Sequence, residues 1–341
     1  MKKIYLVVAS IILSLASIFT IGCGSNDNNT IRLSEVTHSI FYAPLYIAIN
    51  KGYFEEEGLK IELTNGGGAD SCMTAILSGN ADIGLFGPEA TIYVKDGGAK
   101  DNAVIFGQLT KRDGSFLVSK TPTNNFKWSD LVGKTVIGGR AGGVPALTLE
   151  HTMKNNGLTP GAQIDGTHNV KLRTDVAFNL TAPTFTETDA DYCTLFEPVA
   201  SQIVAEGKGH IVASIGEYSG EIPYTAFTAK RSFLKSNNQK AKKFLKAVMR
   251  GYEYLTTANI DEVVDAIYPS FSTTDKATIK SSLQRYISID AWMDTPVMKE
   301  SAYNTLHSII KNAGLINNDV AFRSVVDNSI AEELVASLSN N

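Results

Sequence analysis

The sequence predicts an α/β protein with two lobes, and three observations lead to this expectation. Strand-like and helix-like segments alternate along the chain, as they do in sheets whose parallel strands are joined by helical crossovers. The alternation starts again near residue 128. The chain has 341 residues, whereas single cores stop growing near roughly 250 to 300 residues.

The N-terminus predicts a secretory signal with a lipid attachment site. Lys2 and Lys3 precede an apolar run over residues 4–21, the order of a signal peptide. The segment 20–23 (TIGC) resembles a bacterial lipobox, which implies a signal peptide over 1–22, a lipid on Cys23 and a tether over 23–30. The alternative is an uncleaved membrane helix of roughly 20 residues, with Cys23 incidental.

Composition and cysteine usage are typical of an ordinary globular protein. Hydrophobic residues make up 43% and charged residues 19% of the chain. The net charge of -4 argues against nucleic acid as a partner. Beyond Cys23 only Cys72 and Cys193 remain, too few for a disulfide framework. We expect two free, buried thiols in different lobes; the alternative is a Cys72–Cys193 pair.

The expected first lobe begins with three strands and two helices. The strands are expected over 31–36, 59–63 and 81–86, where apolar residues alternate or run together between turn residues. Apolar stripes at helical spacing lie between them, around residues 45–49 and 73–77.

The second round of the pattern predicts the second lobe and a return to the first. Strands are expected over 135–137, 170–172, 192–196 and 210–215, with helices over 145–154 and from residue 197. A strand over 224–228 then returns the chain to lobe one, and the helical tail packs there. The expected division is lobe one over 31–118 and 228–341, and lobe two over 119–227.

Several segments resemble one known family. The segments 41–48 (FYAPLYIA), 51–59 (KGYFEEEGL), 77–84 (LSGNADIG), 130–134 (DLVGK) and 195–198 (LFEP) are similar to the type II periplasmic solute-binding proteins of the sulfonate, nitrate and thiamine-pyrimidine group. The resemblance implies the two-lobed type II periplasmic binding protein fold, with a helical C-terminal extension packed on lobe one. It also implies a monomer that binds a small molecule between the lobes and hands it to an ABC permease in the membrane, without cofactor or metal.

The carboxyl ends of the strands supply the candidate site residues. In open α/β sheets, ligands bind beyond these ends, where loops and helix N-termini converge. The candidates are Ser39, Phe41, Tyr42, Gly67, Gly68, Ser71, Gly87, Glu89, Arg140, Gly142, Gly143, Glu197 and Tyr224.

Each charged candidate has two interpretations. Glu89 and Glu197 accept hydrogen bonds from ligand N–H groups, or they cap the helices that they begin. Arg140 binds a sulfonate, phosphate or carboxylate, or it is an exposed arginine in a turn.

The uncharged candidates are also ambiguous. Phe41, Tyr42 and Tyr224 stack on a planar ligand, or they pack in the core. The glycines over 66–68 and 138–143 expose backbone N–H groups to a ligand, or they serve turns that need a positive φ.

The sequence favours a receptor over an enzyme. It contains no Gly-x-Ser-x-Gly, His-Glu-x-x-His or Walker A motif. Thiamine pyrimidine synthases share the resemblance, but their lysine and histidine correspond here to Phe86 and Ala90.

The acids and aromatics favour a nitrogen heterocycle such as a thiamine pyrimidine precursor. The alternatives are an organic sulfonate or other oxyanion, a synthase-like enzyme, and a stand-alone sensor or adhesin.

Overall fold

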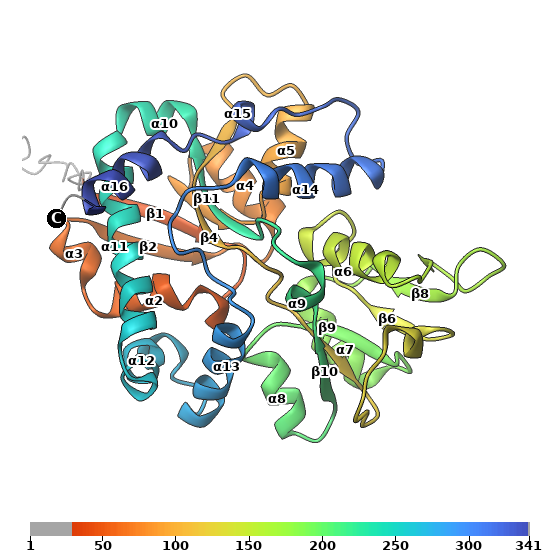
Figure 1. The fold of residues 1–341 in the computed structure, drawn as a ribbon. Helices are drawn as coiled ribbons and strands as arrows, with labels where there is room; N and C mark the ends of the chain where they lie inside the picture. The colour runs from red at the N-terminus through yellow and green to blue at the C-terminus, as the bar shows by residue number, and fades with distance from the viewer. Residues whose placement is uncertain (1–28, 340–341) are drawn as a thin grey trace, which may run out of the picture. The chain divides into compact units, whose positions relative to one another are not determined.

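Two mixed β-sheets organise residues 29–339, the part of the chain that this computed structural model describes (Figure 1). Residues from Ile31 onward form one unit, which is described here by itself. The expected signal peptide, Cys23 and most of the tether lie outside the described residues. Within residues 29–339, no helix combines the length and apolar character needed to cross a membrane.

Sheet A has the strand order β2-β1-β3-β11-β4. β1 runs parallel to β3, whereas β11 runs antiparallel to both β3 and β4. The carboxyl ends of β1 and β3 therefore meet at one edge. The strands are β1 (Thr30–Glu35), β2 (Lys60–Asn65), β3 (Ile83–Phe86), β4 (Ala103–Thr110) and β11 (Thr225–Lys230).

Sheet B has the strand order β10-β5-β9-β6-β8-β7. β6 runs parallel to β8 and β9, and β5 runs antiparallel to β9 and β10. The strands are β5 (Phe116–Ser119), β6 (Thr135–Ile137), β7 (Pro160–Gly161), β8 (Val170–Arg173), β9 (Tyr192–Leu195) and β10 (His210–Ser214).

Helices follow the strands in each lobe. Lobe one, defined as sheet A with its helices, contains η1 (Ile40–Tyr42), α2 (Ala43–Asn50), α3 (Tyr53–Glu56), α4 (Ala69–Ser78) and α5 (Glu89–Asp96). Lobe two, defined as sheet B with its helices, contains η2 (Trp128–Leu131), α6 (Val144–Asn155), η3 (Phe178–Leu180), α7 (Thr181–Glu187), α8 (Val199–Ala205) and α9 (Ile215–Ser219).

The C-terminal helices pack mainly on lobe one, which confirms the expected place of the tail. α11 lies along α2, and α16 contacts β4 and α11 (Figure 1). Two tail helices also touch lobe two, because α13 contacts α8 and α14 contacts α6. The tail comprises α10 (Arg231–Ser236), α11 (Asn238–Thr257), α12 (Ile260–Ile267), η4 (Tyr268–Phe271), α13 (Lys276–Ser288), α14 (Glu300–Asn312), α15 (Phe322–Val325) and α16 (Ser329–Ser339).

Local sequence signals set several helix ends. Gly79 ends α4 with a φ of 80°, a left-handed conformation that glycine adopts without strain. Asn259 and Glu262 form a capping box that begins α12, so backbone N–H groups that lack a helical partner are satisfied there.

Two crossovers over 111–115 and 220–224 join the sheets. They run together, because Ile222 N–H donates to Lys111 O and Tyr224 N–H donates to Thr110 O, at 3.0 and 3.2 Å. The predicted lobe boundaries, 118/119 and 227/228, fall inside β5 and β11, whose pairings assign β5 wholly to sheet B and β11 wholly to sheet A. Cys72 in α4 and Cys193 in β9 are free and buried, as expected for thiols in different lobes.

A close helix crossing gives a test of the packing. A Cβ at Gly251 in α11 would overlap the carbonyl oxygen of Pro44 in α2. Gly251→Ala should therefore destabilise the protein by roughly 1–3 kcal/mol, the usual cost of overpacking. Urea unfolding measures the change, with Gly166→Ala as the control because no atom lies near its Cβ. Equal stability of the two variants would contradict this packing.

Candidate functional site

A cavity of about 170 Å³ lies between the two lobes, and we call it chamber one. Both sheets contribute loops and helix N-termini to its wall. The lining residues are Val36, Thr37, Tyr42, Gly67, Gly68, Ala69, Asp70, Ser71, Gly87, Glu89, Arg140, Gly143, Val144, Pro145, Ala177, Phe178, Phe196, Tyr224 and Thr225.

A second cavity of about 260 Å³, chamber two, adjoins the first. Thr37, Pro145, Phe178 and Phe196 line both chambers. The other lining residues of chamber two are His38, Ser39, Gly139, Asn179, Thr181, Ala182, Thr194, Leu195, Glu197 and Val199. The two chambers are therefore neighbours that share part of their walls.

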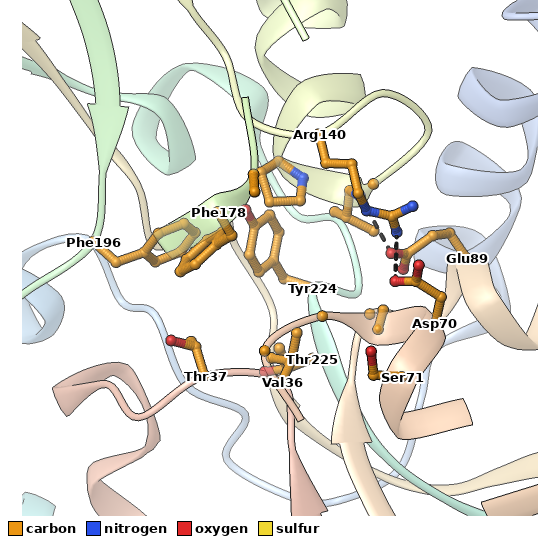
Figure 2. A pocket seen from close by; sticks show the side chains of 18 of the residues that line it. Val36, Thr37, Asp70, Ser71, Glu89, Arg140, Phe178, Phe196, Tyr224 and Thr225 are labelled. Atoms are coloured by element: carbon orange, nitrogen blue, oxygen red, sulfur yellow. Dashed lines mark hydrogen bonds and ion pairs between the residues drawn. The ribbon is translucent and has the colours of Figure 1, made fainter. Parts of the chain in front are cut away.

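The local backbone places the Glu89 carboxyl at chamber one. Gly87 and Pro88 follow the buried strand β3, and Glu89 is the first residue of α5. A Cβ at position 87 would overlap the Glu89 carboxylate, so glycine is required for the side chain to fold back over the loop. Figure 2 shows Glu89 pointing toward Arg140 and Asp70.

The Glu89 side chain is almost completely buried from solvent. It is 3% exposed, and burial raises the pKa of its carboxyl to about 7, although nearby backbone N–H groups and Arg140 counteract part of the effect. Oε1 accepts a 3.4 Å hydrogen bond from Val144 N–H, at the start of α6 in lobe two. Oε2 is buried and meets no hydrogen-bond partner among the described residues. The Glu89 carboxyl therefore contacts lobe two through Oε1 and leaves Oε2 available to a donor.

The positive charge of Arg140 is already paired with a carboxylate in this conformation. Its guanidinium forms a 3.2 Å ion pair with Asp70 from lobe one. Beside this pair, Tyr93 O–H donates a 2.7 Å hydrogen bond to Gly142 O. The two lobes are thus joined at the Arg140 end of the cleft.

Aromatic rings form the opposite wall of chamber one (Figure 2). The ring centroids of Phe178 and Phe196 lie 5.4 Å apart, and those of Phe196 and Tyr224 lie 6.0 Å apart. Burial, together with the nearby Asp113 carboxyl, raises the pKa of Tyr224 well above its usual value. The rings are tilted by 41° and 43° to one another, and they offer an apolar wall against which a planar ligand can pack.

Glu197 has protein partners for both of its carboxylate oxygens. They accept hydrogen bonds from Ser201 N–H and Ser201 O–H, each at 3.0 Å. Arg285 from α13 pairs with the same carboxylate at 2.5 Å. Backbone atoms of Glu197 also bond to lobe one and its tail, because Ser39 O–H donates to Glu197 O and Glu197 N–H donates to Tyr286 O–H. Glu197 thus caps α8 and joins the lobes beside chamber two.

Most of the predicted site residues line one of the two chambers, and two do not. Phe41 is fully buried against Tyr286, Tyr224 and Phe196 behind the chamber wall. Gly142 lines a separate pocket, to which Asp70 and Arg140 also contribute. Chamber one is lined by Tyr42, Gly67, Gly68, Ser71, Gly87, Glu89, Arg140, Gly143 and Tyr224, and chamber two by Ser39 and Glu197.

Sequence reasoning missed several lining residues. Thr37 and Asp70 each lie within two residues of a predicted candidate. Including more residues after each strand would have found them. Phe196 directly precedes the Glu-Pro pair. Phe178 lies in the short helix η3, where no pattern marked a site.

Comparisons with known proteins show the family to which this chain belongs. The family model described as "NMT1/THI5 like" matches residues 40–284. The chain belongs to the NMT1/THI5-like family. It is also 39% identical, over 90% of both chains, to a Bacillus subtilis (strain 168) protein named "Putative binding protein YtlA".

Solved structures confirm the predicted periplasmic binding protein fold. The periplasmic nitrate-binding protein NrtA of Synechocystis PCC 6803 matches with a TM-score of 0.73 and 15% identity, over 92% of this chain and 90% of NrtA. The alkanesulfonate-binding protein SsuA of Xanthomonas axonopodis pv. citri, bound to MOPS, matches with a TM-score of 0.70 and 13% identity, over 88% of this chain and 98% of SsuA. At these identities the likeness concerns the fold alone.

The raised pKa of Glu89 predicts a pH dependence of stability. A folded-state pKa of about 7, against an ordinary value of 4.5, means that the folded protein holds this proton more tightly than the unfolded chain. The contribution is complete below pH 4.5 and is lost as the pH rises through 7. Ligand-free wild-type protein should lose about 3 kcal/mol of unfolding free energy through this group, whereas Glu89→Gln should not.

Chemical denaturation at pH 5 and pH 8 tests this expectation. Glu150→Gln is the control, because Glu150 is a partly exposed acid paired with Lys154. If Glu89→Gln and wild type lose the same stability between the two pH values, Glu89 has an ordinary pKa.

Proposed function

We propose that this protein is a lipid-anchored receptor on the outer face of the cell membrane, which binds a small organic nutrient between its lobes and delivers it to an ABC-type permease. The observation that carries the proposal is the buried, unpaired Glu89 Oε2 at a cavity enclosed by both lobes. A buried acceptor without a donor is costly, so a ligand N–H group that reaches it is strongly favoured. Family membership and the family's shared fold support the same function.

The charges of the cleft favour a nitrogen heterocycle over a sulfonate or another oxyanion. The start of α6, where backbone N–H groups and the helix dipole attract anions, is already occupied by the Glu89 carboxyl. Arg140, the cation of chamber one, is paired with Asp70. An oxyanion at the start of α6 would have to displace the buried Glu89 carboxyl, whereas a planar ring with N–H donors satisfies Glu89 and packs against the aromatic wall. A thiamine-pyrimidine-like ring has this chemistry.

Binding without covalent chemistry is part of the proposal. At the positions that correspond to the lysine and histidine of thiamine pyrimidine synthases, the chain has Phe86, which is fully buried, and Ala90, which is 8% exposed. Neither side chain can transfer a proton or form a bond to a substrate. Candidate ligands incubated with the protein should therefore be recovered unchanged by mass spectrometry.

The ligand class is tested by binding. We expect a thermal-shift screen of the mature domain against vitamins, pyrimidines, sulfonates and amino acids to select a compound with a ring N–H or amino group. At pH 8, Glu89→Gln should weaken its binding by about ten- to a hundredfold, because a hydrogen bond to a charged group contributes roughly 1.5–3 kcal/mol. Titration calorimetry measures the change.

The control for this experiment is again Glu150→Gln, which should bind like wild type. Unchanged affinity of Glu89→Gln, or a large loss of its ligand-free stability, would assign Glu89 a structural role only. Selection of a sulfonate by the screen would replace the heterocycle with the oxyanion alternative.

The lipid anchor rests on the sequence of residues 1–23, which lie outside the described residues. Mass spectrometry of the membrane-extracted protein should find a diacylglyceryl-modified Cys23 at the mature N-terminus, and Cys23→Ser should release the protein from the membrane. An intact Met1 on the mature wild-type protein would contradict this anchor.

A further inference from the structure

Chamber two is a second cavity beside the chamber that Glu89 lines. Their volumes are about 260 and 170 Å³. A single ring that bonds Glu89 and stacks on the aromatic wall occupies chamber one. It leaves chamber two without a ligand group, although ligand sites usually bury most of the ligand surface in a well-filled cavity.

The polar groups of chamber two are available for hydrogen bonds. The side chains of Thr37, Asn179 and Thr194 line it and make no hydrogen bond to the protein within residues 29–339. Thr194 lies in β9 and is only 6% exposed, so its hydroxyl is held rigidly at the chamber wall. Two hydroxyls and one amide can both donate to and accept from a ligand.

The charged groups of chamber two are already paired within the protein. The Glu197 carboxylate binds Arg285 and Ser201. The ring nitrogens of His38 lie 2.9 Å from Glu35 Oε1 and 2.8 Å from Ser270 O. A charged ligand group in chamber two would find no free counter-ion among the described residues, and burying such a charge unpaired is costly.

We propose that the ligand has two parts, a planar nitrogen heterocycle bound in chamber one and a neutral hydroxylated arm bound in chamber two. This inference rests on the proposed function and extends it to the subsite formed by Thr37, Asn179 and Thr194. Phe178 and Phe196 line both chambers, so the link between ring and arm packs against apolar side chains.

Matched pairs of compounds test the two-part ligand. Adenine and cytosine carry amino N–H donors without an arm, and adenosine and cytidine carry the same rings with a neutral hydroxylated arm. Each neutral hydrogen bond to the arm should improve affinity by about three- to tenfold. Titration calorimetry at pH 8 should therefore show tighter binding of at least one nucleoside than of its base. Adding a 5′-phosphate to that nucleoside should weaken its binding.

Variants assign the effect to chamber two. Thr194→Val keeps the shape and removes the hydroxyl, so it should weaken nucleoside binding by about three- to tenfold and leave base binding unchanged. Glu89→Gln should weaken binding of both. The control is Thr135→Val, because Thr135 lies in the neighbouring strand β6 and lines neither chamber.

The possible results separate this inference from the proposed function. Equal affinities for base and nucleoside, or equal losses for both in Thr194→Val, would overturn the two-part ligand while leaving the heterocycle receptor intact. Binding of none of the four compounds would overturn the two-part ligand alone if the thermal-shift screen still selects a heterocycle, and it would overturn the heterocycle receptor as well if the screen selects none.

Discussion

The cleft depends on one constraint, the burial of the Glu89 carboxyl between two lobes. An isolated buried carboxylate costs several kcal/mol, and three features of this chain reduce that cost. Gly87 leaves room for the carboxylate, α5 begins at Glu89 itself, and Val144 N–H approaches Oε1 from the other lobe. None of these features satisfies Oε2. The remaining cost is removed either by a proton or by a ligand donor, so the closed cleft favours an occupant.

The contacts between the lobes differ in strength at the two ends of the cleft. The Arg140–Asp70 pair has side chains that are 47% and 66% exposed, and such surface pairs contribute only about 0–1 kcal/mol. The Glu197 carboxylate is fully buried, and breaking one partner from a buried pair costs much more. Separation of the lobes is therefore easier at the Arg140 end, while the Glu197 end and the paired crossovers hold together.

The sequence predicted the two-lobed alternation of strands and helices, the return of the chain and the placement of the tail, because these depend on local periodicity and on rules of connection. It missed β4 and β5. All eight residues of β4 are buried, so the strand has no polar alternation, and β5 has only four residues. The lobe boundary predicted at 118/119 fell inside β5 because that strand was missed. Most site residues could be found at strand ends, but Phe178 and Asn179 could not, since sequence does not reveal which irregular loop folds over a cleft.

Glu89 and Glu197 show most clearly what separates a binding group from a structural one. By sequence they are equivalent, since each follows a buried strand and stands at a helix start. The structure distinguishes them through partners that are remote in the chain. Arg285 comes from a helix 88 residues beyond Glu197 and satisfies its carboxylate, whereas no such partner reaches Glu89 Oε2 within the described residues. The same reasoning separates Thr194 from paired threonines such as Thr148, which bonds to Asp113. Unsatisfied hydrogen-bonding capacity at a cavity wall, more than residue type, is therefore the basis on which we propose the ligand contacts.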